Sequence, residues 1–322
     1  MEEVLVVNYV KEPVQRRIKA HRSSVEGIAV DNKSNLFFTC SYDHTIKMWD
    51  FEGNLLKSVE FNAENGEPAI VTALGICPKG EFLVAGSNAE IVVYSLPELQ
   101  LVVRKNFRNV EATASVPAIV AEVSSIAISP DSTKLVVGID NGTIKVFEFP
   151  ELKYMNTFHQ QTFGLGVFLT FWDSTTFFSA AESVNRWNIN NLDSVRPEFL
   201  ELPYDFKARD ITVDRTKELL YVAGSGEREN IKIYSLMDLK FQYALPESQS
   251  VTTVRVSREG IMVAGTKDRD LGDSVKLWDP EKKELLRTLN CPLPNLNSLE
   301  ITSEGNLLIS THENGSIILW NF

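Results

Sequence analysis

The side chains that most often carry acid–base, nucleophilic or metal chemistry are scarce in this sequence and widely spaced. The four histidines stand too far apart for a metal-binding pattern, and the three cysteines form no C-x-x-C pair. These residues are His21, His44, His159, His312, Cys40, Cys77 and Cys291. We therefore expect no metal site and no cofactor, and we expect the cysteines to be buried, inert thiols.

Motifs of common catalytic machinery are also missing. The sequence has no glycine-rich phosphate loop, no G-x-S-x-G elbow and no H-E-x-x-H zinc motif. Two acidic clusters, at residues 64–67 and 268–270, have two open interpretations: they are solvated loops, or they receive a basic partner. We predict that the protein is not an enzyme.

The overall charge of the chain indicates which kinds of partner it attracts. The 32 lysine and arginine residues against 43 aspartate and glutamate residues give a formal net charge of −11. This balance disfavours unspecific attraction to nucleic acid or anionic lipid, so we expect neither among the partners, and a partner steered by the field would be basic. The basic stretch from Arg16 to Arg22 departs from this balance. It is either an outer strand with one face in water or a contact for an acidic or phosphorylated segment.

Targeting signals are not recognisable. No segment approaches the roughly 20 apolar residues that a membrane helix needs, and the apolar run from Val4 to Val7 is too short for a signal peptide. The odd number of widely separated cysteines fits a reducing compartment. We expect an intracellular protein, cytoplasmic or nuclear.

A short pattern that returns seven times organises the chain. Each copy is an apolar, β-branched stretch that ends on an aromatic residue, and successive aromatics are 40 to 53 residues apart. The aromatics are Trp49, Tyr94, Phe147, Trp187, Tyr234, Trp278 and Trp320. Periods of this length are typical of repeat folds, in which each unit buries its faces against its neighbours.

Each copy of the pattern follows two further apolar stretches. The nearer stretch ends in residues with small side chains, as in FLVAGS and IMVAGT. A turn signal such as PKGE or TSEG separates this stretch from the strand upstream of it. A fourth strand follows most of the aromatics, for example Leu55 to Glu60 and Phe241 to Leu245. Four strands at a period of about 45 residues predict an all-β, seven-bladed β-propeller with four-stranded antiparallel blades.

The two ends of the sequence suggest how the ring closes. The last unit stops two residues after Trp320 and therefore lacks an outermost strand. Residues 1–20 hold two extended stretches, Val4 to Val10 and Val14 to Ile18. Pairing one of them with the seventh unit would close the ring and cover an exposed strand edge. Nothing then remains for a second domain, so we expect residues 1–322 to form a single propeller domain.

The unit SYDHTIKMWD, with a histidine upstream, resembles the repeats of the WD-repeat family, whose blades end in Trp-Asp. The resemblance implies a propeller and a hydrogen-bonded network in the first blade. Its members would be His21, Thr39, Asp43 and Trp49. The resemblance covers the whole chain as a repeat, although Tyr or Phe replaces the Trp in three units.

Function is expected where loops meet on a rigid scaffold. We predict a non-catalytic scaffold or adaptor that binds a peptide or protein partner on the loop-rich rim, as a monomer within a larger complex. The candidate contact residues are aromatics and arginines of the rim loops, namely Tyr42, Phe107, Phe163, Tyr204, Phe206, Arg228 and Arg269. The alternative is an enzyme or small-ligand binder that uses the central cavity, which would show a convergent polar or titratable cluster around the axis.

Two smaller questions stay open in the sequence. His44 and His312 fall in hairpin turns of the first and last blades, which are neighbours in a closed ring, so they either meet or are solvated separately. Trp172 lies at a turn on the opposite rim, where it either caps its blade or contacts a partner.

Overall fold

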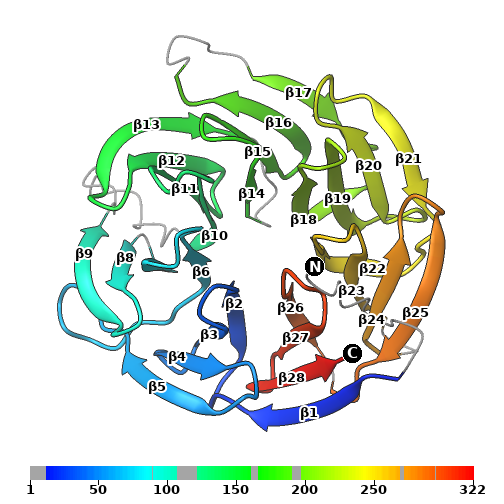
Figure 1. Cartoon of the computed structure of the whole chain (residues 1–322). Coiled ribbons are helices and arrows are strands. Elements are labelled where there is room, and N and C mark those ends of the chain that lie inside the picture. Colours follow the sequence, from blue (N-terminus) through cyan, green and yellow to red (C-terminus); the bar gives the residue numbers. More distant parts are fainter. Residues whose placement is uncertain are drawn as a thin grey trace, which may run out of the picture.

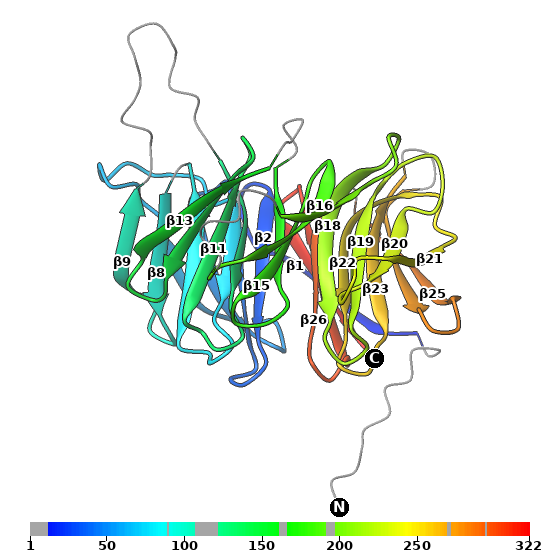
Figure 2. The same cartoon turned by 90° about the horizontal axis from the view of Figure 1, so that it is seen from above.

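The computed structural model describes residues 12–88, 90–106, 122–160, 166–190, 197–268, 272–293 and 295–322. These residues form seven sheets of four antiparallel strands each. Viewed down the axis, the sheets stand like blades around a central opening (Figure 1). Viewed from the side, the ring is a disc whose turns gather on its two faces (Figure 2). The predicted fold class, an all-β propeller of seven four-stranded blades, is confirmed.

Each blade has an inner strand beside the axis, two middle strands and an outer strand, and blades 1 to 7 follow the chain. The inner strands are β2 (Val25–Asp31), β6 (Ala73–Ile76), β10 (Val123–Ile128), β14 (Phe168–Phe171), β18 (Lys207–Asp214), β22 (Ser250–Val256) and β26 (Leu296–Ile301). The second strands are β3 (Leu36–Ser41), β7 (Phe82–Ser87), β11 (Lys134–Ile139), β15 (Thr176–Ala180), β19 (Leu219–Ser225), β23 (Met262–Lys267) and β27 (Leu307–His312).

The third strands are β4 (Thr45–Asp50), β8 (Glu90–Ser95), β12 (Thr143–Glu148), β16 (Ser183–Asn188), β20 (Ile231–Ser235), β24 (Ser274–Asp279) and β28 (Ser316–Asn321). The outer strands are β5 (Leu55–Glu60), β9 (Gln100–Asn106), β13 (Lys153–His159), β17 (Glu198–Glu201), β21 (Phe241–Leu245), β25 (Glu284–Asn290) and β1 (Val14–Lys19). All seven aromatics of the repeat pattern lie on third strands and are buried.

The turns between inner and second strands form where the sequence signals them. Gly80 of PKGE and Gly305 of TSEG have φ angles of 76° and 72°, in the left-handed region that glycine adopts without strain. Such turns reverse the chain within a few residues. Each blade is therefore an antiparallel meander.

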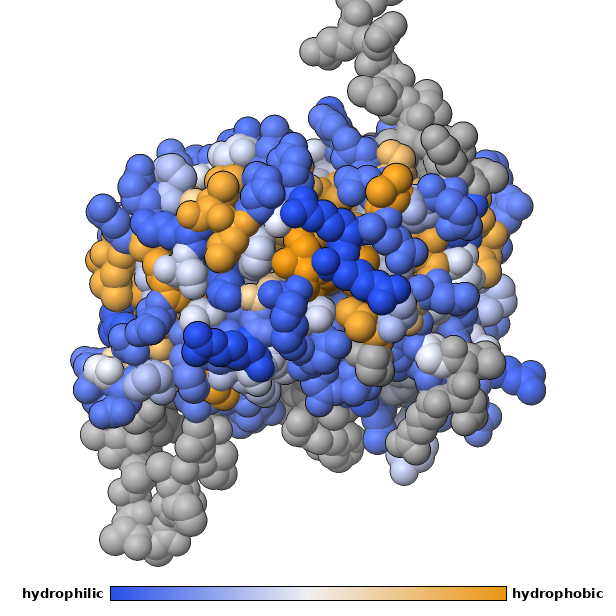
Figure 3. Space-filling view, turned by 90° about the horizontal axis from the view of Figure 1, so that it is seen from below, coloured by the Kyte–Doolittle hydropathy of each residue, from blue (hydrophilic) through white to orange (hydrophobic). Residues whose placement is uncertain are grey.

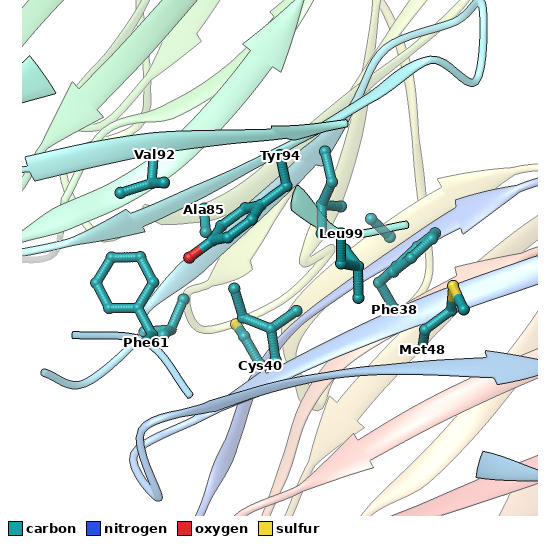
Figure 4. Packing of buried hydrophobic residues seen from close by; sticks show 12 residues of the cluster. Phe38, Cys40, Met48, Phe61, Ala85, Val92, Tyr94 and Leu99 are labelled. Carbon is teal, nitrogen blue, oxygen red and sulfur yellow. The ribbon is translucent and has the colours of Figure 1, made fainter. Parts of the chain in front are cut away.

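Packing between neighbouring blades forms the hydrophobic core. The buried apolar residues fall into seven clusters, and each cluster joins two adjacent blades. Between blades 1 and 2, Phe38 and Met48 pack with Tyr94 and Leu99 from the next blade (Figure 4). Because both faces of the middle strands are covered, their sequences are apolar runs rather than alternating patterns.

Small residues on the second strands allow the blades to approach closely. A Cβ atom on Gly138 would lie 2.6 Å from the carbonyl oxygen of Val167, which precedes the inner strand of the next blade. A Cβ atom on Gly86 would lie 2.5 Å from Cγ1 of Val123 on β10. The small residues at the ends of the predicted strands therefore lie where neighbouring blades touch. At Gly86 and Gly138 only glycine allows so close an approach.

The N-terminal strand closes the ring. β1 pairs antiparallel with β28 from Val14 opposite Asn321 to Lys19 opposite Ser316, which supplies the outer strand of blade 7. One hydrophobic cluster joins blades 7 and 1, and Ile18 of β1 packs against it. The predicted stretch from Val14 to Ile18 is thus the closing strand, whereas the stretch from Val4 to Val10 lies outside the described residues.

We predict that deleting residues 1–19 destabilises the ring. The deletion exposes the backbone edge of β28 and removes the packing of Ile18, so the melting temperature should fall and the protein should aggregate. Arg17→Ala, which keeps the pairing with β28, is the matched control and should melt like the wild type. A deleted protein that remains monomeric with an unchanged melting temperature would show that closure does not depend on β1.

Candidate functional site

The predicted contact residues that the structure describes lie on one face of the disc. On this face the inner strands begin, and the turns between second and third strands and the connections between blades lie here; we call it the loop face. Tyr42 is in the β3–β4 turn, Tyr204 and Phe206 are in the β17–β18 connection, and Arg228 is in the β19–β20 turn. Phe107, Phe163 and Arg269 lie outside the described residues.

Three of these four side chains are accessible. Tyr204 is fully exposed, Arg228 is exposed, and the exposed fraction of Tyr42 is 38%. Phe206 is only 4% exposed and packs into the hydrophobic cluster between blades 4 and 5, with Lys232 Nζ 4.9 Å from its ring centroid. The ring of Phe206 therefore supports the loop from below, and the prediction that it contacts a partner is not carried forward.

A buried network fixes the turn that carries Tyr42. His21 Nδ1 lies 3.1 Å from both carboxylate oxygens of Asp43, and the backbone N–H of Arg22 donates to the same carboxylate at 2.8 Å. The backbone N–H of Tyr42 donates to the carbonyl of Ser24 at 3.2 Å. These bonds tie the β3–β4 turn to the start of β2, so the turn is held rigidly.

The network continues into the blade and determines the tautomer of His21. Trp49 Nε1 donates to Thr39 Oγ1 at 2.9 Å, and Thr39 Oγ1 lies 2.8 Å from His21 Nε2. With its oxygen accepting from Trp49, the Thr39 hydroxyl donates to Nε2, so the proton of the neutral imidazole is on Nδ1, facing Asp43. The four residues named from the family resemblance thus form one hydrogen-bonded chain in blade 1.

The pKa values in the network follow from burial and hydrogen bonding. Burial lowers the pKa of His21 to about 4 and outweighs the opposing effect of the Asp43 carboxylate. Burial alone would raise the pKa of Asp43, but hydrogen bonds from Thr45, the Arg22 backbone and His21 lower it to about 2. At neutral pH the pair is therefore a neutral imidazole and a carboxylate.

Blades 4 and 7 contain related networks built from other residues. In blade 4, Trp187 Nε1 donates to Ser179 Oγ at 2.7 Å, and Ser179 donates to Gln160 Oε1, so a glutamine takes the place of the histidine. In blade 7, Trp320 Nε1 donates to Ser310 Oγ at 3.2 Å. The sequence did not indicate the role of Gln160, because an amide is not part of the family pattern.

Blade 6 has the tryptophan without its acceptor. Trp278 Nε1 is buried and has no hydrogen-bond partner among the described residues. Ala264 pairs with the residue two positions before Trp278, which is the place that Thr39 takes in blade 1. The methyl group of Ala264 offers no lone pair, so this N–H remains unsatisfied.

The surroundings of Tyr42 are acidic. Burial raises the pKa of the Tyr42 hydroxyl to about 12, and Glu26 and Glu122 add to the effect. Burial likewise raises the pKa of Glu122, and nearby Asp140 and Glu26 raise it further. These carboxylates give the loop face near blades 1 to 3 a negative potential that favours a basic partner.

The remaining sequence questions have structural answers. The partly buried ring of Trp172 packs against the cluster between blades 4 and 5, with its centroid 6.2 Å from that of Phe178, as the capping alternative expects. His312 is buried in β27, with Nε2 3.1 Å from Ser310 Oγ, whereas His44 occupies a turn with a φ of 66°. His312 therefore makes this hydrogen bond within its own blade.

The basic stretch forms β1 and residues beside it. Arg16 donates to the carbonyl of Glu52 in blade 1, and Lys19 donates to the carbonyl of Asn314 in the β27–β28 turn of its own blade. On the side of the ring drawn in Figure 3, apolar patches are separated by hydrophilic residues. This side therefore shows no continuous apolar surface.

A central cavity of about 330 Å³ opens between the inner strands of all seven blades. Charged side chains from opposite blades line it, among them Glu26 and Arg209. Neither residue stood out in the sequence, because the pairing of the inner strands decides which side chains face the axis. Among the described residues, no group of three or more His, Cys, Asp and Glu side chains is arranged to hold a metal ion. In the same residues, no helix is long and apolar enough to cross a membrane.

The comparison with known families agrees with this architecture. The sequence matches the family described as WD domain, G-beta repeat, over residues 12–50, 118–148 and 283–321. The first and last matches end at the third strands β4 and β28, beside Trp49 and Trp320. The seven four-stranded blades and the closure by the N-terminal strand are the architecture of a WD-repeat β-propeller.

One relative among the curated proteins is the U3 small nucleolar RNA-associated protein 15 homolog of Bos taurus. It is 24% identical over 288 residues, which cover 84% of this chain and 50% of the relative. The chain therefore spans about half the length of that protein. The similarity supports the family and leaves the partners of this chain to be inferred.

The lowered pKa of His21 in the folded state predicts a pH-dependent stability. The unfolded histidine binds a proton below pH 6.5 and the folded one only near pH 4, so acidification through this window favours the unfolded chain. The stability that is fully present above pH 6.5 should fall by up to about 3 kcal/mol by pH 4. His21→Gln, which copies Gln160 of blade 4, should be nearly as stable at pH 7 and lose this part of the decline. If urea unfolding gave the wild type and His21→Gln the same dependence of stability on pH, the lowered pKa of folded His21 would be contradicted.

The unsatisfied indole of blade 6 predicts a stabilising substitution. Ala264→Ser places a hydroxyl where Trp278 Nε1 lacks an acceptor, so the free energy of unfolding should rise by about 1 kcal/mol. The matched control is Ala85→Ser at the same place in blade 2, where the aromatic is Tyr94 and no indole N–H is present. That substitution should destabilise the protein. Equal effects of the two substitutions on urea unfolding would rule out the missing hydrogen bond as the cause.

Proposed function

We propose that this chain is a non-catalytic adaptor whose loop face binds a peptide or protein partner, and that its blades act together as one binding domain. The observation that carries the proposal is the complete exposure of Tyr204, with Arg228 exposed on the adjacent turn of the same blade. Tyrosine and arginine are the residue types that most often dominate binding energy at interfaces. A fully exposed tyrosine on a folded scaffold is suited to that role.

The scaffold supports this surface in two places. In blade 5 the Tyr204 loop rests on buried Phe206, and its neighbour Asp205 approaches the turn that contains Arg228, with Glu227 N donating to Asp205 at 3.5 Å. In blade 1 the His21 network holds the turn of Tyr42. Rigid presentation lowers the entropy lost when a partner binds. The two places lie on opposite sides of the central opening, so a partner that touches both must span it (Figure 1).

The chemistry of the partner follows from the charge. The net charge of −11 and the carboxylates near Tyr42 favour a basic segment over an acidic one. The relative's name associates that protein with a small nucleolar RNA, so the sequence-based exclusion of nucleic acid is not retained. We propose that the chain works inside the cell, in an assembly in which a partner protein makes the contact with the loop face. A nuclear location fits the relative's name better than a cytoplasmic one.

A pulldown followed by mass spectrometry tests the loop face. Tyr42→Ser, Tyr204→Ser and Arg228→Ser together should remove the partner that the wild type captures, while circular dichroism and melting temperature stay nearly unchanged. The control combines Phe199→Ser and Met237→Ser, two exposed apolar residues of blades 4 and 5 that lie outside the loop face. Nuclease treatment of the lysate shows whether capture passes through RNA.

Two results would overturn the proposal. Capture that survives the triple substitution but is lost in the control would place the interface elsewhere on blades 4 and 5. Capture that depends on RNA and is unaffected by the triple substitution would point to direct binding of nucleic acid instead of protein.

A further inference from the structure

The cavity on the axis has a regular construction that the adaptor function does not use. Five of the seven inner strands contain a register shift at the same level, near the loop face, where one residue is inserted relative to the second strand. The inserted residues are Glu26, Ser124, Arg209, Thr252 and Asn297. All five line the cavity. Bulges of this kind redirect a side chain, and here they redirect one from each of five blades toward the axis.

The three uncharged residues among these five donate hydrogen bonds to backbone carbonyls of the blades. Ser124 Oγ donates to the carbonyl of Val167 in the next blade at 3.1 Å. Asn297 Nδ2 donates to the carbonyl of Val25 in blade 1 at 3.1 Å, and Thr252 Oγ1 donates to the carbonyl of Gly265 at 3.3 Å. These bonds give Ser124, Asn297 and Thr252 a structural role.

The two charged members have no comparable role. The side chain of Arg209 makes no hydrogen bond or ion pair with any residue that the structure describes. Its neighbour Asp210 is fully engaged by Arg255, whose Nη1 lies 2.6 Å away and whose Nε lies 2.6 Å from Glu300. Arg255 therefore balances the charges of Asp210 and Glu300, and neither carboxylate depends on Arg209.

Glu26 lacks an ion pair within the described part of the chain as well. Burial raises its pKa, a hydrogen bond from Ser24 lowers it, Glu313 raises it further, and the charge of Lys267, which forms no ion pair with it, lowers it. A partly desolvated carboxylate without a paired cation is a costly arrangement unless a ligand supplies the charge. β2, which carries Glu26, and β18, which carries Arg209, stand on opposite sides of the central opening (Figure 1).

We propose that the cavity binds a small zwitterion, a molecule between an amino acid and a short peptide in size, with its ammonium group toward Glu26 and its carboxylate toward Arg209. A guanidinium is the side chain best matched to a carboxylate, because it donates two parallel hydrogen bonds. The volume of about 330 Å³ lies at the lower end of the range for small-molecule sites. Thr170 and Thr212 also line the cavity, and their hydroxyls provide further polar contacts.

Binding of glycine, diglycine and triglycine to the full chain tests this site, because the three probes vary the distance between the two charges. Each probe is used as the free zwitterion, as the N-acetylated form and as the C-amidated form, and saturation-transfer NMR with titration gives the dissociation constants. At least one zwitterion should bind at millimolar concentration or below, and each blocked form should bind about tenfold more weakly or worse, which is the loss of one charged contact.

The substitutions assign the two charges separately. Arg209→Gln should remove the difference between the free and the C-amidated probe but keep the effect of N-acetylation, and Glu26→Gln should do the reverse. Arg258→Gln, an exposed arginine in a turn on the opposite face, is the matched control and should leave all constants unchanged. Melting temperatures confirm that each variant is folded. If Glu26→Gln unfolds, Arg209→Gln still decides, since Arg209 holds no other residue in place.

The proposal is overturned if no zwitterion binds the folded wild type better than its blocked forms, or if Arg209→Gln leaves the preference for the free carboxylate intact. Neither outcome affects the adaptor function. The test of that function uses Tyr42, Tyr204 and Arg228, none of which lines the cavity.

Discussion

The structure depends on face-to-face packing between neighbouring blades. A single four-stranded blade has two apolar faces and cannot bury either by itself, so each blade is stable only between two others. The last blade must therefore meet the first, and the cluster that joins Val25 and Trp49 to Leu307 and Leu319 provides that contact. β1 completes it by covering the edge of β28. Because the blades stand this close together around an axis, there is no room for a side chain at Gly86 and Gly138. The same arrangement leaves a cavity at the centre of the ring.

Polar interactions then hold the ring in ways that differ from blade to blade. Blades 1, 4 and 7 each satisfy a buried indole N–H through a hydroxyl, whereas in blade 6 the indole N–H of Trp278 has no partner among the described residues. On the axis, Arg255 of blade 6 bridges Asp210 of blade 5 and Glu300 of blade 7. Burial opposes the charge of Arg255, but the two carboxylates raise its pKa, so it remains charged. This partly buried arginine is tolerated because both of its partners are present, and removal of either would leave an unpaired charge.

Most of the fold could be predicted from the sequence, because each blade repeats the same pattern of aromatic residues, small residues and turns. The outer strands Leu55–Glu60 and Phe241–Leu245 and the closing strand near Val14 coincide with the predicted ones. β17 was not predicted, since Glu198–Glu201 is short and half acidic, and only its pairing with β16 makes it a strand.

The candidate site was less predictable, because it depends on tertiary contacts. Phe206 and Tyr204 are two residues apart in one loop, and nothing local distinguishes the buried ring from the exposed one. Glu26 and Arg209 look like ordinary polar strand residues. They face the axis because a bulge inserts one residue at that level, and the bulge depends on how the strand pairs within its blade and packs on the next.

Site-specific photocrosslinking in cells tests the central claim that the loop face is the contact surface. A photoreactive benzoylphenylalanine in place of Tyr204 reports on the loop face, and the same group in place of Met237 reports on an exposed position outside it. The account predicts that irradiation joins a distinct protein to the chain through position 204 and not through position 237. A crosslinked protein at position 237 with none at position 204 would contradict it.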